Sequence, residues 1–172
     1  MKTSTVLRQQ TLIGLHASAR FSKCGLYRYV LTRTWDDERP PVCFIGLNPS
    51  IATEKDLDPT IRRCIGFAKS WGAGGIVMLN AFAIIDPKPA VMKAAGAEAI
   101  GPENDFWIRK HARLSSEVVV CWGTDGTYRE REAALLQLLK RIGVTVKCLG
   151  KTKDGFPRHP LYLRKDTPLI NY

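Results

Sequence analysis

The sequence predicts an α/β three-layer sandwich: helices cover both faces of a central, mostly parallel four-stranded sheet, and a β-hairpin precedes it at the N-terminus. Three observations predict this fold. Four short apolar runs are separated by segments of helical periodicity, which is the pattern of successive β-α-β units. A short polar motif follows three of these runs. The N-terminal region alternates polar and apolar residues with the period of a β-strand.

The N-terminal region predicts two antiparallel strands, at 11–21 and 26–35, joined by a turn at 22–25. Tyr27, Tyr29 and Leu31 alternate with their neighbours in a weak period of two, which suits a hairpin with one exposed face. Residues 36–41 form a polar loop that ends in two prolines. The parallel part of the sheet is expected to begin after this loop.

The four predicted core strands are rich in β-branched and apolar residues, which suits strands buried on both faces. They lie at 42–47, 76–79, 118–122 and 144–149. Asp58 and Pro59 predict a helix start, because aspartate caps a helix and proline at the first helical position sacrifices no hydrogen bond. This helix ends at Gly72, and two further helices are predicted at 101–114 and 129–142, the last ending before Gly143.

Composition favours one globular domain that interacts with a polyanion. The chain has 172 residues, of which 45% are hydrophobic, and we expect a single domain with an extension at 1–41 and an α/β core at 42–172. Lys and Arg number 26 against 16 Asp and Glu, which gives a net charge of +10. The charge predicts nucleic acid, DNA rather than RNA, or a nucleotide as the partner.

The five cysteines are scattered without C-x-x-C or metal-ligand spacing. They predict reduced, structural thiols and no metal site. Polar residues interrupt the N-terminus before an apolar segment of signal-peptide length, and we identify no segment that could span a membrane. We therefore expect a cytoplasmic monomer that makes no membrane contact.

The three polar motifs that follow apolar runs are the main functional signal. They occupy 46–50, 80–82 and 158–162. In an open parallel sheet, the carboxyl ends of the strands meet at one crevice, so residues far apart in sequence come together there. The motifs therefore predict one active site.

These motifs resemble those of the uracil-DNA glycosylase superfamily. The order is Gly-x-Asn-Pro at 46–49, Leu-Asn at 79–80, Trp-Gly at 122–123 and His-Pro at 159–160. The first motif is most similar to the mismatch-specific thymine/uracil glycosylase branch, which also has Asn at this place. The chain resembles more closely, and over nearly its whole length, an uncharacterised bacterial and phage family, DUF1643. That family is typified by the segments at 48–50, 58–64 and 157–162, and it implies no established activity.

The glycosylase resemblance implies hydrolysis of the N-glycosidic bond of a uracil-like, mismatched or modified base, without a cofactor. Asn48, held by Pro49, has a side-chain carbonyl that can orient a water molecule. Because a neutral amide is a poor general base, we expect Asp56 to assist, whereas Asp58 is better placed as a helix cap. His159 matches the superfamily histidine that stabilises charge developing on the departing base.

The base-binding group is expected to centre on Asn80, whose amide offers both a donor and an acceptor to a base edge. Phe82 is a candidate for stacking on the base. Each has a structural alternative: Asn80 can cap the turn after its strand, and Phe82 can belong to the core. The other expected members of this group are Gly46, Pro49 and Ser50.

Nucleic-acid contacts are expected around His159. Leu161 and Tyr162 match the segment that the glycosylases insert into a duplex, although both are bulkier than the usual residues. Lys151, Lys153 and Arg158 are expected to contact phosphates. Two alternatives stay open: a non-catalytic module that binds nucleic acid or a modified nucleotide, and an enzyme that acts on free nucleosides or nucleotides.

Overall fold

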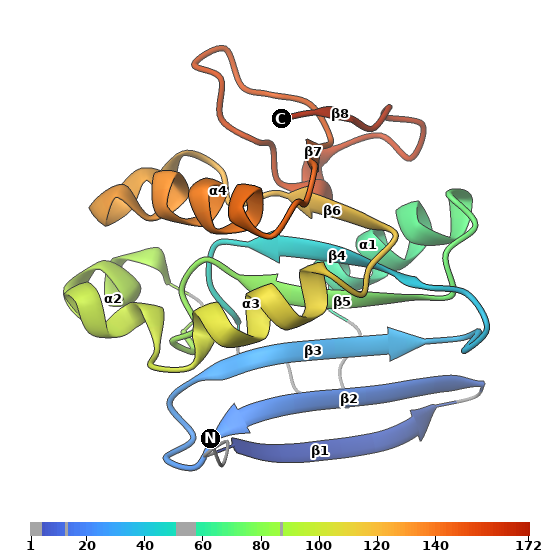
Figure 1. Cartoon of the computed structure of the whole chain (residues 1–172), viewed down its shortest axis with the longest axis horizontal. Helices are drawn as coiled ribbons and strands as arrows, with labels where there is room; N and C mark the ends of the chain where they lie inside the picture. Colours follow the sequence, from blue (N-terminus) through green and yellow to red (C-terminus); the bar gives the residue numbers. More distant parts are fainter. Residues whose placement is uncertain (1–4, 13, 51–57, 87) are drawn as a thin grey trace.

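The computed structural model describes residues 5–12, 14–50, 58–86 and 88–172, which form a mixed α/β fold around one eight-stranded sheet (Figure 1). The strand order is β1-β2-β3-β5-β4-β6-β7-β8. The strands are β1 (Thr5–Leu12), β2 (Leu15–Ser22), β3 (Arg28–Thr34), β4 (Pro41–Gly46), β5 (Gly75–Asn80), β6 (Glu117–Val120), β7 (Val146–Cys148) and β8 (Ile170–Asn171). The α-helices are α1 (Pro59–Ser70), α2 (Pro89–Ala94), α3 (Asn104–Ala112) and α4 (Arg131–Arg141), with 3₁₀ turns η1 (Gly96–Ile100), η2 (Thr124–Glu130) and η3 (Pro160–Tyr162).

The sheet is mixed, and the predicted four-stranded, mostly parallel sheet is wrong. The pairs β5–β4, β4–β6 and β6–β7 are parallel, whereas the other four pairs are antiparallel. The region predicted as a separate hairpin joins the main sheet through β3, which pairs with β5. Because β3 lies between two strands, most of its side chains are buried, which a weak period of two did not indicate.

Two N-terminal strands replace the single strand predicted at 11–21. β1 and β2 form an antiparallel pair that turns at Gly14, where a φ of +73° favours glycine. The apolar residues on both sides of Gly14 had suggested one continuous strand. At the other edge, β8 pairs with β7 and was not predicted, because a two-residue strand leaves no detectable pattern.

Helices cover both faces of the parallel strands. In Figure 1, α3 and α4 lie in front of the sheet and α1 lies behind it. The side chains divide in the same way: Cys43, Ile45 and Val77 belong to the core beneath α3 and α4, whereas Phe44 and Ile76 belong to the core beneath α1. Strands buried on both faces can expose polar groups only at their ends, which is where the motifs lie.

The helix starts illustrate both a correct and an incorrect prediction. Asp58 is the N-cap of α1, as predicted, and its Oδ1 accepts a hydrogen bond from the Ile61 N–H at 2.8 Å. α4 begins at Arg131 rather than at 129, because Arg129 and Glu130 have φ values of 53° and 56°. These left-handed conformations interrupt a helical side-chain pattern that looks continuous in the sequence.

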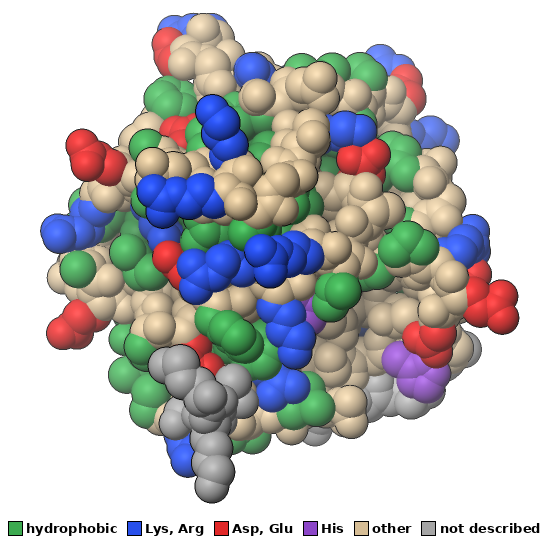
Figure 2. All heavy atoms as spheres, viewed as in Figure 1, with side chains coloured by type: hydrophobic (Ala, Val, Ile, Leu, Met, Phe, Trp, Pro, Cys, Tyr) green, Lys and Arg blue, Asp and Glu red, His purple; other side chains and the backbone are tan. Residues whose placement is uncertain are grey.

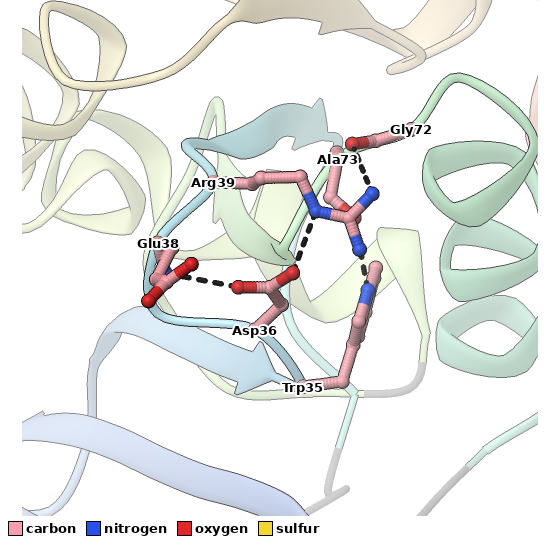
Figure 3. Close-up of polar contacts among 6 residues, drawn as sticks. All are labelled: Trp35, Asp36, Glu38, Arg39, Gly72 and Ala73. Carbon is pink, nitrogen blue, oxygen red and sulfur yellow. Dashed lines mark hydrogen bonds and ion pairs between the residues drawn. The ribbon is translucent and has the colours of Figure 1, made fainter.

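A cluster of polar contacts fastens the loop before β4 to the turn between α1 and β5 (Figure 3). Asp36 accepts from Arg39 Nε at 2.6 Å, and Arg39 Nη1 donates to the Gly72 carbonyl at 3.1 Å. The Trp35 indole donates to the Ala73 carbonyl at 2.9 Å. We call these contacts the amino-end clamp, because they join segments that lead into the amino ends of β4 and β5.

Candidate functional site

The three motifs meet at a cavity of about 340 Å³ beyond the carboxyl ends of β4, β5 and β6. This volume lies at the lower end of the range for small-molecule sites, which is about 300–1,000 Å³. The lining includes Gly46, Asn48, Asn80, Trp122, His159 and Tyr162. The structure therefore brings together residues from all three polar motifs, as the strand-end pattern predicted.

Asn48 is half-buried at the cavity and its amide nitrogen is held in place. Asn48 Nδ2 donates to the Asp86 carbonyl at 2.6 Å, and the Asp86 N–H donates to the Pro49 carbonyl at 3.0 Å. These two bonds join the loop after β4 to the loop after β5. With its nitrogen engaged in this way, Asn48 can present its carbonyl oxygen to a water molecule or ligand.

Asn80 ends β5 and is only 3% exposed. A Cβ at Gly46 would lie 2.9 Å from Met78 Cε and 3.0 Å from Asn80 Oδ1. A glycine at 46 therefore leaves space for the side chain that the sequence proposed as the base reader. The prediction that both residues belong to the site agrees with their place in its lining.

Two buried side chains hold the backbone that carries Asn80. Asn104 Nδ2 donates to the Asn80 and Ala81 carbonyls at 2.9 and 3.1 Å. Arg131 Nε donates to the same Ala81 carbonyl at 2.7 Å, and Arg131 Nη2 pairs with Asp105 at 2.5 Å. The sequence analysis missed Asn104 and Arg131, because a polar residue near a helix start gives no sign that it is buried.

His159 lines the cavity just before η3. Its Nδ1 accepts a hydrogen bond from the Leu161 N–H at 3.3 Å, so the neutral ring carries its proton on Nε2. Burial lowers the pKa of His159, and the charge of Asp58 only partly opposes this effect. A neutral ring that donates from Nε2 is suited to an electron-rich atom of a ligand.

Arg28, Ser50 and Asp58 form an ionic cluster on the cavity wall. Arg28 Nη1 donates to the Ser50 carbonyl at 3.5 Å, and Ser50 Oγ donates to Asp58 Oδ2 at 3.4 Å. Arg28 is only 4% exposed, and burial lowers its pKa to about 10 although Asp58 acts in the opposite direction. Asp58 therefore both caps α1 and lines the cavity. The sequence analysis placed Arg28 on an exposed hairpin and so missed it.

Four other predicted site residues are placed differently. Among the described residues around the cavity, Phe82, Pro49 and Leu161 are not part of its lining. Phe82 is fully buried in the core, with its ring centre 6.0 Å from that of Tyr128, so it is not placed to stack on a ligand in the cavity. Asp56 lies outside the described residues.

Exposed cations lie on a loop that leads into His159. Lys151, Lys153 and Arg158 are all exposed there. The loop is closed by a hydrogen bond of 3.1 Å from the Arg158 N–H to the Gly150 carbonyl. Tyr162, 78% exposed, lies at the cavity on the other side of His159.

A second group of cations lies over α3 and α4. Figure 2 shows Lys and Arg side chains gathered across the middle of the face on which these helices lie. Arg109, Lys110, Arg113 and Arg141 are exposed cations of these helices or of the residue that follows α3. Such a face attracts polyanions over long range.

The described part of the chain contains no group of three or more His, Cys, Asp or Glu residues that could hold a metal ion. In the same part, no helix combines the length and the hydropathy needed to cross a bilayer. The reactive groups at the cavity are therefore the side chains themselves: two amides, a histidine, an arginine and a carboxylate.

A family model described as a protein of unknown function, DUF1643, matches residues 28–161. The matched segment begins at Arg28 and includes Asn48, Asn80 and His159, so it contains every polar side chain of the cavity named above except that of Tyr162. A search of curated proteins finds no match.

Proposed function

This chain belongs to the DUF1643 family of proteins of unknown function, and from its cavity we propose that it hydrolyses the N-glycosidic bond of a nucleotide unit with a uracil-like, mismatched or modified base. The convergence of Asn48, Asn80 and His159 in one cavity carries the proposal. Three separate segments contribute these side chains, in the order in which the uracil-DNA glycosylase superfamily places its own motifs.

The reaction needs a positioned water, a group to accept its proton, and a donor for the departing base. The carbonyl oxygen of Asn48 orients the water, whose oxygen forms the new bond to C1′ of the sugar. Asp58 is the carboxylate among the described lining residues, and it accepts the proton that the water loses. The electron pair of the C1′–N bond leaves with the base, which later takes a proton from solvent.

His159 and Asn80 act on the base. The Nε2 donor of His159 stabilises negative charge as it develops on the base, where a neutral imidazole is sufficient. Asn80 recognises a base edge with its amide, and the bonds to its backbone from Asn104 fix its position. The exposed Tyr162 ring offers a surface on which an unstacked base or its neighbour can stack.

The test is a base-release assay on single-stranded and duplex oligonucleotides that contain uracil, G·U and G·T mismatches, hypoxanthine and common modified bases. We expect release of at least one of these bases by the wild type. Asn48→Ala should lower the rate about 100-fold or more, the usual cost of removing one positioned polar group from an active site.

Asn171→Ala is the matched control, because Asn171 is an exposed asparagine on β8, outside the described cavity lining. Release that is equal in the wild type, Asn48→Ala and Asn171→Ala would remove Asn48 from the mechanism. Silence of the wild type across the whole panel would reject base hydrolysis on nucleic acid.

A further inference from the structure

We propose that Arg28 is a phosphate-binding residue of the cavity, so that the ligand enters with a phosphate against this guanidinium and its base toward Asn80. The inference rests on the proposed function in that the ligand is a nucleotide. It adds a ligand group that the three motifs do not contact, and a residue that lies outside all of them.

Arg28 reaches the cavity from the antiparallel part of the sheet. Its N–H donates to the Ala83 carbonyl at 2.9 Å, which fixes the start of β3 beside the segment that follows β5. The register between β2 and β3 shifts here: Phe21 pairs with Arg28, whereas Arg20 pairs with Val30. Such bulges re-aim side chains next to functional sites.

The guanidinium is buried without full compensation. Its side chain is 4% exposed, and Asp58 supplies an opposite charge. That carboxylate is shared, because it also accepts from the Ile61 N–H and the Ser50 hydroxyl. Burial still lowers the pKa of Arg28 to about 10, and the positive charge of Arg33 acts in the same direction. An anionic ligand oxygen would add the charge that Asp58 does not supply.

The surroundings of Arg28 suit a phosphate in particular. Arginine binds phosphate oxygens with two parallel hydrogen bonds, and serine and threonine hydroxyls commonly complete such sites. Ser50 and Thr60 line the cavity together with Arg28. The three residues are linked through Asp58, which bonds Ser50 and lies two positions before Thr60.

The cavity thus has two chemically different ends. Arg28, Ser50 and Asp58 contact one another at the ionic end. Asn80 lies against Gly46 at the amide end. A nucleotide whose base meets Asn80 has its phosphate on the far side of the sugar, and the ionic end is the part of the described lining that can neutralise it.

The experiment measures binding by calorimetry for deoxyuridine, thymidine, deoxyguanosine and deoxyinosine, each beside its own 5′-monophosphate. For at least one base, we expect the wild type to bind the monophosphate about 10- to 100-fold more tightly than the nucleoside, the range for a charge-assisted hydrogen bond in a buried site. Arg28→Gln should remove this preference and leave nucleoside affinity within about threefold. Arg141→Gln, which removes an exposed charge on α4, should keep the preference.

A wild type that binds nucleoside and monophosphate equally, or binds neither, overturns the inference. If Arg28→Gln does not fold, Arg28→Lys decides, because it keeps the charge and loses the two-pronged geometry. It should lose most of the preference, and an unchanged preference overturns the inference. Thr60→Val should weaken monophosphate binding alone, whereas an equal effect on the nucleoside counts against a phosphate at this end.

A dinucleotide with one internal phosphodiester distinguishes the two sources of phosphate. A larger Arg28-dependent gain for the dinucleotide identifies a nucleic-acid backbone, and a larger gain for the monophosphate identifies a free nucleotide. Failure of the two proposals is distinguishable. Arg28-dependent phosphate binding without base release would leave this inference and reject hydrolysis, whereas base release without phosphate preference would do the reverse.

Discussion

The two ends of the parallel strands carry polar residues of different kinds. At the amino end, Asp36, Arg39 and Trp35 find their partners in one another and in neighbouring carbonyls. At the carboxyl end, Asn48, Asn80 and His159 surround a cavity, and the bonds they make hold the side chain or its backbone in place. The comparison shows that polar side chains at strand ends indicate a binding site only where a cavity lies between them.

The largest expected effect concerns His159 at the carboxyl end. His159→Asn keeps an acceptor near the Nδ1 position for the Leu161 N–H and removes the Nε2 donor. The account predicts a fall of about 100-fold or more in kcat/KM for base release. His159→Gln can place a donor near the Nε2 position, and it should retain more activity than His159→Asn. Equal losses in the two variants would show that the ring acts through its shape.

Arg131 tests whether the backbone below Asn80 depends on buried donors. Arg131→Met removes a bond to the Ala81 carbonyl and leaves Asp105 without its ion-pair partner. We expect the free energy of unfolding to fall by about 2–3 kcal/mol. Urea denaturation measures the change, with exposed Arg141→Met on the same helix as the control. If both variants lose the same stability, Arg131 has no special role.

His111, at the end of α3, belongs to the other side of the comparison because it should affect stability alone. Burial, with Lys110 and Arg20 nearby, lowers its pKa from 6.5 to about 4. The unfolded chain therefore binds more protons between these values, and stability falls as pH drops from 6.5 to 4. Partial exposure reduces the loss to about 1–2 kcal/mol.

His111→Phe keeps a ring beside Trp107 and removes the titration. Urea unfolding at pH 7.5, 5.5 and 4.5 should therefore show a flatter pH dependence for this variant than for the wild type, with His159 contributing a remaining slope in the same direction. Identical slopes for the variant and the wild type would contradict the assignment.

The smallest effect is expected at the amino-end clamp. Asp36→Ala removes an ion pair in which Arg39 is 51% exposed, so the free energy of unfolding should fall by about 0.5–1 kcal/mol. Nucleotide affinity should not change, because the clamp lies at the opposite end of the strands. A thermal melt and a binding titration on the same sample test both points, and reduced affinity would break the comparison.

The sequence predicted those features that local patterns determine. Strand β4 follows from a run of β-branched and apolar residues, α1 follows from Asp58 and Pro59, and the shared site follows from motifs at strand ends. Arg28 could not be found in this way. Its burial depends on pairing between β3 and β5, which are more than 40 residues apart in sequence.

Phe82 and Arg129 illustrate two further limits. An aromatic residue after a strand has the same pattern whether it faces a cavity or the core, and Phe82 faces the core. The left-handed backbone at Arg129 and Glu130 shortened a helix whose apolar spacing continues past its start. In both cases the outcome depends on neighbours that are distant in the sequence.

The most direct test of the central claim is an NMR titration of the ¹⁵N-labelled protein with deoxyuridine 5′-monophosphate and deoxyinosine 5′-monophosphate. The account predicts that the side-chain amide signals of Asn48 and Asn80 and the backbone signals around His159 shift together, while the Trp35 indole signal at the amino end stays unchanged. Shifts at Trp35 without shifts at Asn48 and Asn80, or no shifts with either nucleotide, would contradict a nucleotide site at the carboxyl ends of the strands.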